Sequence, residues 1–152
     1  MASPFQVRPA TADDHTFLVR ANLGLARETE DLALDETVLR AGVARALADA
    51  GRARYFVAER DRATVGSLMI TLEWSDWRDG WIWWIQSVYV VPEARRQGVY
   101  RALHGHVVEA ARATGEVRLV RLYVDKHNAR ARSTYEAMGM SLGRYDLMEQ
   151  AI

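Results

Sequence analysis

Residues 88–100 read VYVVPEARRQGVY, and this stretch decides most of what the sequence tells about the fold. An apolar run that stops at Pro92 is typical of a buried strand. Apolar residues then recur at helical spacing, which predicts a helix over about 96–113. The N-terminus of a helix exposes unpaired backbone N–H groups and attracts phosphate, and Gly98 would let a ligand approach closely. An ordinary strand–turn–helix corner with solvated arginines explains this stretch equally well.

The rest of the chain surrounds this corner with alternating and helical patterns, and these predict a mixed α/β fold. Strands are expected at 5–8, 54–59, 64–73, 81–91 and 118–125, and helices at 11–27, 35–51, 96–113 and 128–138. Residues 140–148 predict one further strand, or two short ones around Gly143. The order β-α-α-β-β-β-α-β-α-β-β gives a mostly antiparallel sheet flanked by helices. We find no repeat or linker, so residues 1–152 are expected to form a single domain.

Composition narrows the class of protein. The chain has 49% hydrophobic and 26% charged residues, which is ordinary for a globular domain. Its formal net charge of zero gives no electrostatic support for binding nucleic acid. It contains no cysteine, which excludes disulfides, thiolate metal sites and a cysteine nucleophile. No apolar run is long enough to cross a membrane and no secretory leader opens the chain, so a cytoplasmic protein is expected.

A second motif lies in the predicted helix 128–138. Asn128 and Tyr135 are seven residues apart, so they share a helix face, and Ala131 lies between them. Together with Arg95-x-x-Gly98 and the order of elements, this helix resembles the GNAT superfamily of N-acetyltransferases over essentially the whole chain.

The resemblance implies acetyl-coenzyme A (acetyl-CoA) as cofactor and assigns roles to both motifs. It implies that residues 88–90 pair with the pantetheine arm and that backbone amides of 95–100 hold the pyrophosphate. It implies that Asn128 contacts the pantetheine region and that Tyr135 is the general acid. Tyr100 departs from the family, which often has glycine or alanine there. The implied cofactor-binding residues are Val88, Tyr89, Val90, Arg95, Arg96, Gln97, Gly98, Val99, Tyr100, Asn128 and Ala131.

The sequence leaves the general base open. Many family members carry a glutamate on the central strand, whereas this chain has Gln86 and Ser87 there. Glu73 is the preferred candidate because it ends the neighbouring predicted strand. The alternatives are the carboxylates of Asp76, Glu28 and Glu30, or a chain of water molecules.

All five tryptophans fall within residues 74–84. We interpret Trp74, Trp77 and Trp83, with Asp76, as walls of an acceptor pocket, because aromatic faces beside carboxylates favour a cationic amine. A dimer interface is the competing interpretation, since tryptophan is also enriched there. Glu28 and Glu30 resemble the substrate-side loop of the superfamily and are expected to close the same pocket.

The sequence therefore predicts an N-acetyltransferase that moves an acetyl group directly from acetyl-CoA to a small cationic amine, with a homodimer as a further expectation. The four histidines form no recognisable metal site, and no nucleic-acid or membrane partner is expected. Two alternatives remain open. One is an acetyltransferase that acts on a protein lysine or N-terminus, and the other is a non-catalytic module that binds coenzyme A.

Overall fold

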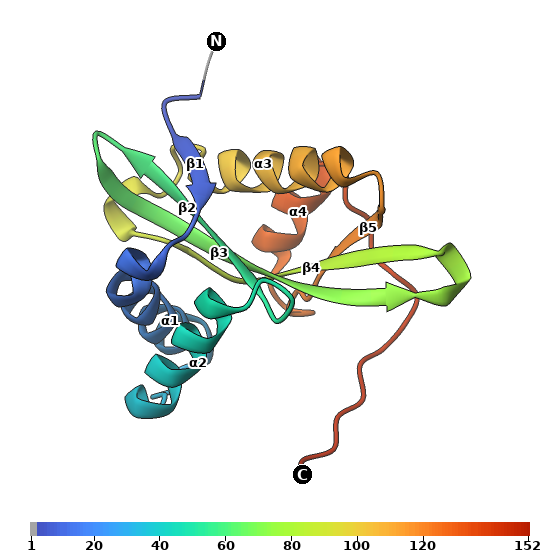
Figure 1. Ribbon diagram of the computed structural model, residues 1–152, viewed down its shortest axis with the longest axis horizontal. Coiled ribbons are helices and arrows are strands. Elements are labelled where there is room, and N and C mark those ends of the chain that lie inside the picture. The colour runs from blue at the N-terminus through green and yellow to red at the C-terminus, as the bar shows by residue number, and fades with distance from the viewer. Residues whose placement is uncertain (1–2) are drawn as a thin grey trace.

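The computed structural model describes residues 3–152 and has a five-stranded sheet at its centre (Figure 1). The strands lie in the order β1-β2-β3-β4-β5, and only the pair β4–β5 is parallel. Their bounds are Gln6–Pro9, Arg54–Arg60, Ala63–Ser75, Gly80–Val90 and Val117–Leu122. The helices are α1 His15–Glu30, α2 Glu36–Ala48, α3 Val99–Thr114 and α4 Ala129–Ala137. The mixed, mostly antiparallel fold predicted from the sequence is confirmed.

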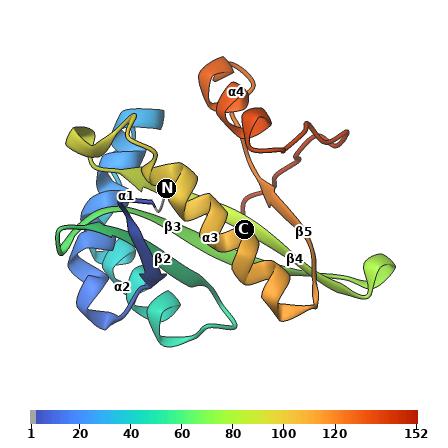
Figure 2. The same cartoon turned by 90° about the horizontal axis from the view of Figure 1, so that it is seen from above.

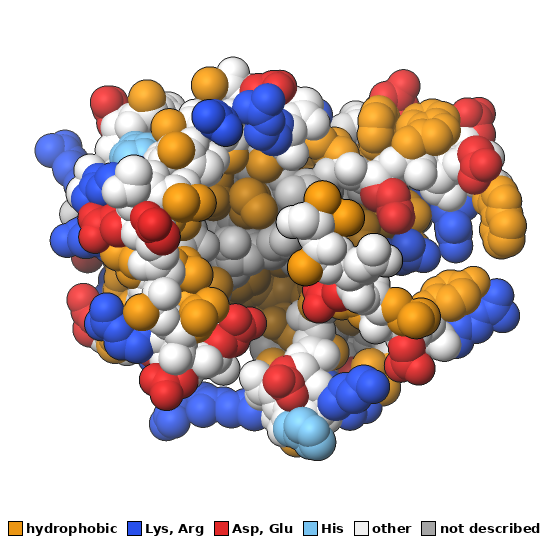
Figure 3. Space-filling view, turned by 90° about the horizontal axis from the view of Figure 1, so that it is seen from below, with side chains coloured by type: hydrophobic (Ala, Val, Ile, Leu, Met, Phe, Trp, Pro, Cys, Tyr) orange, Lys and Arg blue, Asp and Glu red, His pale blue; other side chains and the backbone are white. Residues whose placement is uncertain are grey.

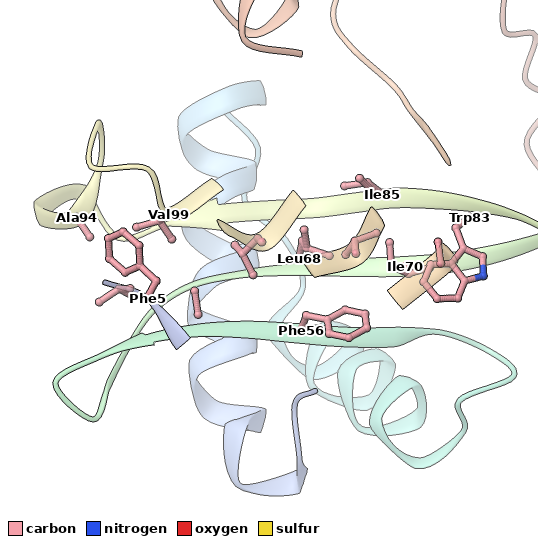
Figure 4. Close-up of a cluster of buried hydrophobic side chains, with 13 residues drawn as sticks. Phe5, Phe56, Leu68, Ile70, Trp83, Ile85, Ala94 and Val99 are labelled. Carbon is pink, nitrogen blue, oxygen red and sulfur yellow. The ribbon is translucent and has the colours of Figure 1, made fainter. Parts of the chain in front are cut away.

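Helices cover both faces of the sheet, because successive side chains of a strand point to opposite faces and pack against helices on each side. In β2, Phe56 and Ala58 belong to a core cluster with α3, whereas Tyr55 and Val57 pack with α1 and α2 on the other face. Figure 4 shows the first cluster, in which Leu68 and Ile70 of β3 lie in one group with Phe56 of β2 and Trp83 and Ile85 of β4. Figure 2 shows α3 lying across the sheet. None of the described helices is long and apolar enough to cross a membrane.

An ion-pair network fastens the first strand to the turn that follows it. Arg8 donates to Asp14 Oδ2 at 2.8 Å and to Glu59 Oε1 at 2.6 Å. Asp14 also accepts from the backbone N–H of Thr11 at 2.7 Å, which completes a capping box. Because these bonds favour the carboxylate, the pKa of Asp14 lies below its usual value, chiefly through the hydrogen bond from Arg8.

The structure corrects two predicted helix boundaries and one predicted strand. α1 continues through the acidic residues to Glu30, where Asp31 ends it in a left-handed conformation. α3 starts at Val99 rather than 96, because Arg96 and Gly98 have φ of 62° and 89°, which no α-helix accommodates. The strand expected over 140–148 is wrong, since those residues form no ladder with any described strand.

Candidate active site

The site begins where β4 separates from β5. The two strands pair from Trp81 to Ile85, and β4 then continues to Val90 without β5 beside it. A bulge lies at this point, because Ser87 and Val88 together oppose Leu68 of β3. Ser87 has φ 52°, a left-handed conformation that bends the strand. The main chain of residues 88–90 is thereby left with one free edge, which faces the gap between the strands.

The N-terminus of α3 lies at the end of that edge. Gly98 has φ 89° and no atom within 4 Å of the position that a Cβ would take, so open space lies against it. No side chain within residues 3–152 caps this helix. The first N–H to bond along the helix is that of Ala102, to the carbonyl of Gly98 at 3.0 Å. The backbone N–H groups before it are therefore available to an anion.

The cleft is lined by arginines, some with unpaired guanidinium groups and one whose guanidinium group is paired. Within the described residues, the guanidinium groups of Arg96, Arg101 and Arg130 have no ion-pair or hydrogen-bond partner. Arg95, in contrast, donates to Glu28 Oε2 at 2.6 Å and to the carbonyl of Val90 at 2.9 Å. Three free cations beside an uncapped helix N-terminus suit a polyphosphate, while Arg95 ties the turn to α1.

α4 forms the opposite wall and carries the second motif. The side-chain oxygen of Asn128 accepts from the backbone N–H of Ala131 at 3.0 Å and so caps the helix. Its amide nitrogen stays available to donate to a ligand. Tyr135 lies two turns further on, and no described group hydrogen-bonds its hydroxyl. Burial raises the pKa of Tyr135, so the phenol keeps its proton at neutral pH.

Tyr100 connects the two walls. Its ring meets that of Tyr135 edge-on, with the centroids 5.6 Å apart. Its hydroxyl lies 3.1 Å from Nδ1 of His104, one turn further along α3. Burial raises the pKa of Tyr100 and lowers that of His104, so both side chains are uncharged at neutral pH. The bulky residue that departs from the family pattern thus packs against Tyr135.

These elements border two adjoining cavities that are open to solvent. One, of about 270 Å³, is lined by Val88, Tyr100, Asn128, Arg130, Ala131, Thr134 and Tyr135. The other, of about 1120 Å³, extends from there along β4 to the N-terminus of α3 and to Leu25 and Glu28 of α1. The space-filling view from below shows a hollow in this face of the molecule, with hydrophobic side chains along its walls (Figure 3).

Most of the predicted cofactor residues therefore meet in one place, on β4, the turn and α4. Gln97 is the exception, since it lines neither cavity. Its side-chain oxygen accepts from Arg60, and its amide donates to the carbonyl of Glu93 at 2.9 Å. The cleft thus offers unpaired backbone N–H groups and free guanidinium groups, which are the donors that a phosphate group needs.

The predicted acceptor residues do not come together. Trp83 is only 2% exposed and belongs to the core, so its place in an acceptor pocket is wrong. Trp74 and Trp77 lie with Asp76 towards the tip of the β3–β4 hairpin, where both rings are exposed. Trp74 pairs with Trp81, about 23 Å along the strand from Val88.

The carboxylate candidates are also dispersed. Glu73 pairs with Ile82, about 20 Å along β4 from Val88, and accepts from Arg121 at 3.2 Å. Glu28 lines the larger cavity, whereas Glu30, two residues further along α1, is exposed and lines neither.

Sequence reasoning missed four polar residues that line the cleft. Arg101, Arg130, Ser133 and Thr134 all border the cleft. The helical pattern contained a signal for Thr134, which follows the predicted residue Ala131 by three positions and so shares its face of the helix.

Comparisons with known proteins agree with this geometry. Residues 25–140 match the family described as "Acetyltransferase (GNAT) family". A possible acetyltransferase from Clostridium difficile 630 is 37% identical, with a TM-score of 0.92 over 97% of each chain. The chain matches none of the curated proteins.

Two less similar structures share the fold. A predicted acetyltransferase from Clostridium acetobutylicum, solved with acetyl-CoA, is 18% identical, with a TM-score of 0.78 over 96% of each chain. An aminoglycoside acetyltransferase from an uncultured soil metagenomic sample, solved with trehalose, is 15% identical, with a TM-score of 0.75 over 97% of this chain and 95% of that one. With the family match over residues 25–140, the conclusion is that this chain belongs to the GNAT family of acetyltransferases.

Proposed function

We propose that the protein is an N-acetyltransferase that moves an acetyl group directly from acetyl-CoA to a small amine. One observation carries this proposal. The free edge of β4, the uncapped N-terminus of α3 and the Tyr135 side chain border two adjoining cavities. The family uses acetyl-CoA as its acetyl donor, which supplies an activated thioester.

The proposed binding mode follows from the donors around the cleft. The backbone N–H groups at the start of α3 would hold the pyrophosphate, with Arg96 and Arg101 adding charge. The free edge of residues 88–90 would pair with the amides of the pantetheine arm, as an added strand does. The Asn128 amide nitrogen would donate to the same arm, because its oxygen is already used to cap α4.

The proposed chemistry is a single displacement, since the chain has no cysteine to carry the acetyl group. The amine nitrogen forms a bond to the carbonyl carbon, and the carbon–sulfur bond breaks. Tyr135 gives its proton to the departing sulfur, a task that its raised pKa permits at neutral pH. A backbone N–H of residues 88–90 polarises the carbonyl oxygen. The amine loses its proton to water.

We infer a small acceptor from the size of the cavity beside Tyr135. Its volume is about 270 Å³, and the pantetheine arm proposed to lie on Val88 and Asn128 would occupy part of it. That space suits a compact amine better than a folded protein surface. Glu28 at the far wall would favour a cationic amine, although in this structure its carboxylate is held by Arg95.

Calorimetry of acetyl-CoA binding tests the proposal, with Gly98→Glu as the disruptive variant. That change puts a carboxylate where the pyrophosphate is proposed to lie, and we expect binding to weaken by at least about 100-fold. Gly105→Glu is the matched control, because it adds the same charge two turns further along α3, also in open space. Equal binding by wild type and Gly98→Glu would refute the proposed cradle.

Thiol release over a panel of small amines and lysine peptides then tests the reaction. We expect turnover with small amines, and a loss in kcat of about 10²–10⁴-fold for Tyr135→Phe with acetyl-CoA affinity retained. Turnover confined to peptides would indicate a protein acetyltransferase. Tight binding without any turnover would indicate a non-catalytic module.

A further inference from the structure

Tyr100 takes up room where the two adjoining cavities meet. It lies in the first turn of α3 and lines both cavities, whereas Tyr135 lines only the smaller one. The side chain is uncharged at neutral pH, because burial raises the pKa of Tyr100 above its ordinary value. It therefore adds no charge to the proposed phosphate site beside it, and its role depends on what its ring and its hydroxyl contact.

The ring of Tyr100 bridges the two walls of the cleft. It meets the ring of Tyr135 edge-on, with the centroids 5.6 Å apart and the ring planes at 68°. Aromatic pairs prefer this arrangement, because the positive edge of one ring meets the negative face of the other. α4, which carries Tyr135, buries none of its residues and stands apart from the sheet (Figure 2). Tyr100 thus restricts the direction of the Tyr135 ring from the facing helix.

His104 fixes the hydroxyl of Tyr100. Nδ1 of His104 lies 3.1 Å from that hydroxyl, and the two residues are four apart on α3, which puts them on one face of the helix. The imidazole is only 7% exposed, and among the described residues this is its one hydrogen bond. Two contacts in series therefore connect the buried side of α3 to the proposed general acid, first from His104 to the Tyr100 hydroxyl and then from ring to ring.

We propose that Tyr100, anchored by His104, is a positioning residue that holds the Tyr135 ring where its hydroxyl can reach the sulfur of a bound thioester. This inference rests on the proposed function, in which the Tyr135 proton goes to the departing sulfur as the carbon–sulfur bond breaks. Tyr100 neither gives nor takes a proton in that step. It limits the orientations of the acid before the step begins, which is how a fixed geometry lowers a reaction barrier.

Kinetics separates this role from that of a plain wall of the cleft. Loss of a wall should raise the Kd of acetyl-CoA, whereas loss of a positioning contact should lower kcat. We expect Tyr100→Leu, which removes the ring contact, to lower kcat by about 10–100-fold with the Kd of acetyl-CoA unchanged. Tyr100→Phe keeps the ring and loses only the bond to His104, so its kcat should lie between those of wild type and Tyr100→Leu. An unchanged kcat in Tyr100→Leu, or an effect confined to the Kd, would overturn the proposal.

A double-mutant cycle shows whether Tyr100 acts through Tyr135. A residue that only positions the acid has no effect once the acid is gone, so Tyr100→Leu should lower kcat in the wild type and leave it unchanged in Tyr135→Phe. Equal losses in both backgrounds would refute the proposal. Tyr123→Leu is the matched control, because Tyr123 stacks on Trp84 at 4.6 Å and lines neither cavity. It removes an aromatic contact of the same kind and should leave kcat unchanged in both backgrounds.

NMR relaxation of carbon-13-labelled tyrosine rings gives a test that needs no turnover. The Tyr135 signals are those that disappear in Tyr135→Phe, and their relaxation reports ring motion on the nanosecond timescale. We expect an ordered Tyr135 ring in the wild type and in Tyr100→Phe, and a mobile one in Tyr100→Leu. A Tyr135 ring that is equally ordered in Tyr100→Leu would overturn the positioning role while leaving the proposed function intact. A wild type that turns over no amine would instead refute the proposed function, and the role of Tyr100 with it.

Discussion

Substituting two glycines of the same helix tests the conformation on which the anion site rests. A Cβ added at Gly98 or at Gly105 would meet nothing within 4 Å, so neither Gly→Ala change creates a clash. The two positions differ in backbone angle, because Gly98 has φ 89° and Gly105 lies inside α3. Opposite effects on stability are therefore expected from chemically identical substitutions.

The magnitudes follow from that difference. A left-handed conformation costs an L-residue about 1–2 kcal/mol in the folded state. Alanine also lowers the conformational entropy of the unfolded chain, which offsets about 0.4–1 kcal/mol of that cost. Gly98→Ala should therefore lower the free energy of unfolding by about 1 kcal/mol. Gly105→Ala, at an exposed position inside the helix, should raise it by about 0.5–1 kcal/mol. For a chain of this length the melting temperatures should shift by about 2–4 °C per kcal/mol in opposite directions.

Urea unfolding followed by tryptophan fluorescence measures both variants, with an unchanged slope expected for each. Acetyl-CoA at a hundred times its Kd should add about 2.7 kcal/mol to any variant that still binds it. A Gly98→Ala protein as stable as wild type would refute the reasoning, because residue 98 would then not need the left-handed conformation that exposes the N–H groups of α3.

Three further predictions use the same measurements. Asp14→Ala should cost about 1.5–3 kcal/mol through the lost bonds to Arg8. The pKa of Asp14 is lowered on folding, so this stability is present above pH ~4 and is lost as the pH falls through the folded pKa. The urea unfolding curves of wild type and Asp14→Ala should therefore converge at low pH. Asn128→Asp should keep the helix cap, whereas Asn128→Ala should remove it and lower the free energy of unfolding by about 1 kcal/mol. Both variants lack the amide donor, so both should weaken acetyl-CoA binding in calorimetry. Burial raises the pKa of Tyr100, so above pH ~10 the unfolded state releases that proton more readily than the folded state and the free energy of unfolding of the wild type falls. The free energy of unfolding of Tyr100→Phe should fall less between pH 7 and 11.

The cofactor side of the cleft could be predicted from the sequence because local patterns determine it. A strand that stops at Pro92, a glycine and a following helical period locate the α3 N-terminus to within a turn. The seven-residue spacing of Asn128 and Tyr135 puts both on one face of α4, and both line the smaller cavity. Each inference needs only the geometry of one element and its neighbour.

The acceptor side depends on distances that no local pattern contains. Glu73 and Trp74 are close to β4 in the sequence, but β3 and β4 are long strands, and their pairing carries both residues towards the far end of the hairpin. Alternation along β4 does not tell which face of the strand meets the core, so Trp83 was predicted to line a pocket although it belongs to the core. The segment 140–148 has a strand pattern, but a strand exists only where an edge receives it.

The site depends on one of the least buried parts of the chain. α4 contributes no buried residue, yet it carries Asn128 and Tyr135 and leads directly into the C-terminal segment. A helix of nine residues gains little stability from its own hydrogen bonds, so its position depends on what it packs against. In the single chain that support comes chiefly from the contact of Tyr135 with Tyr100. The position of the proposed general acid therefore rests on an aromatic contact between α4 and α3.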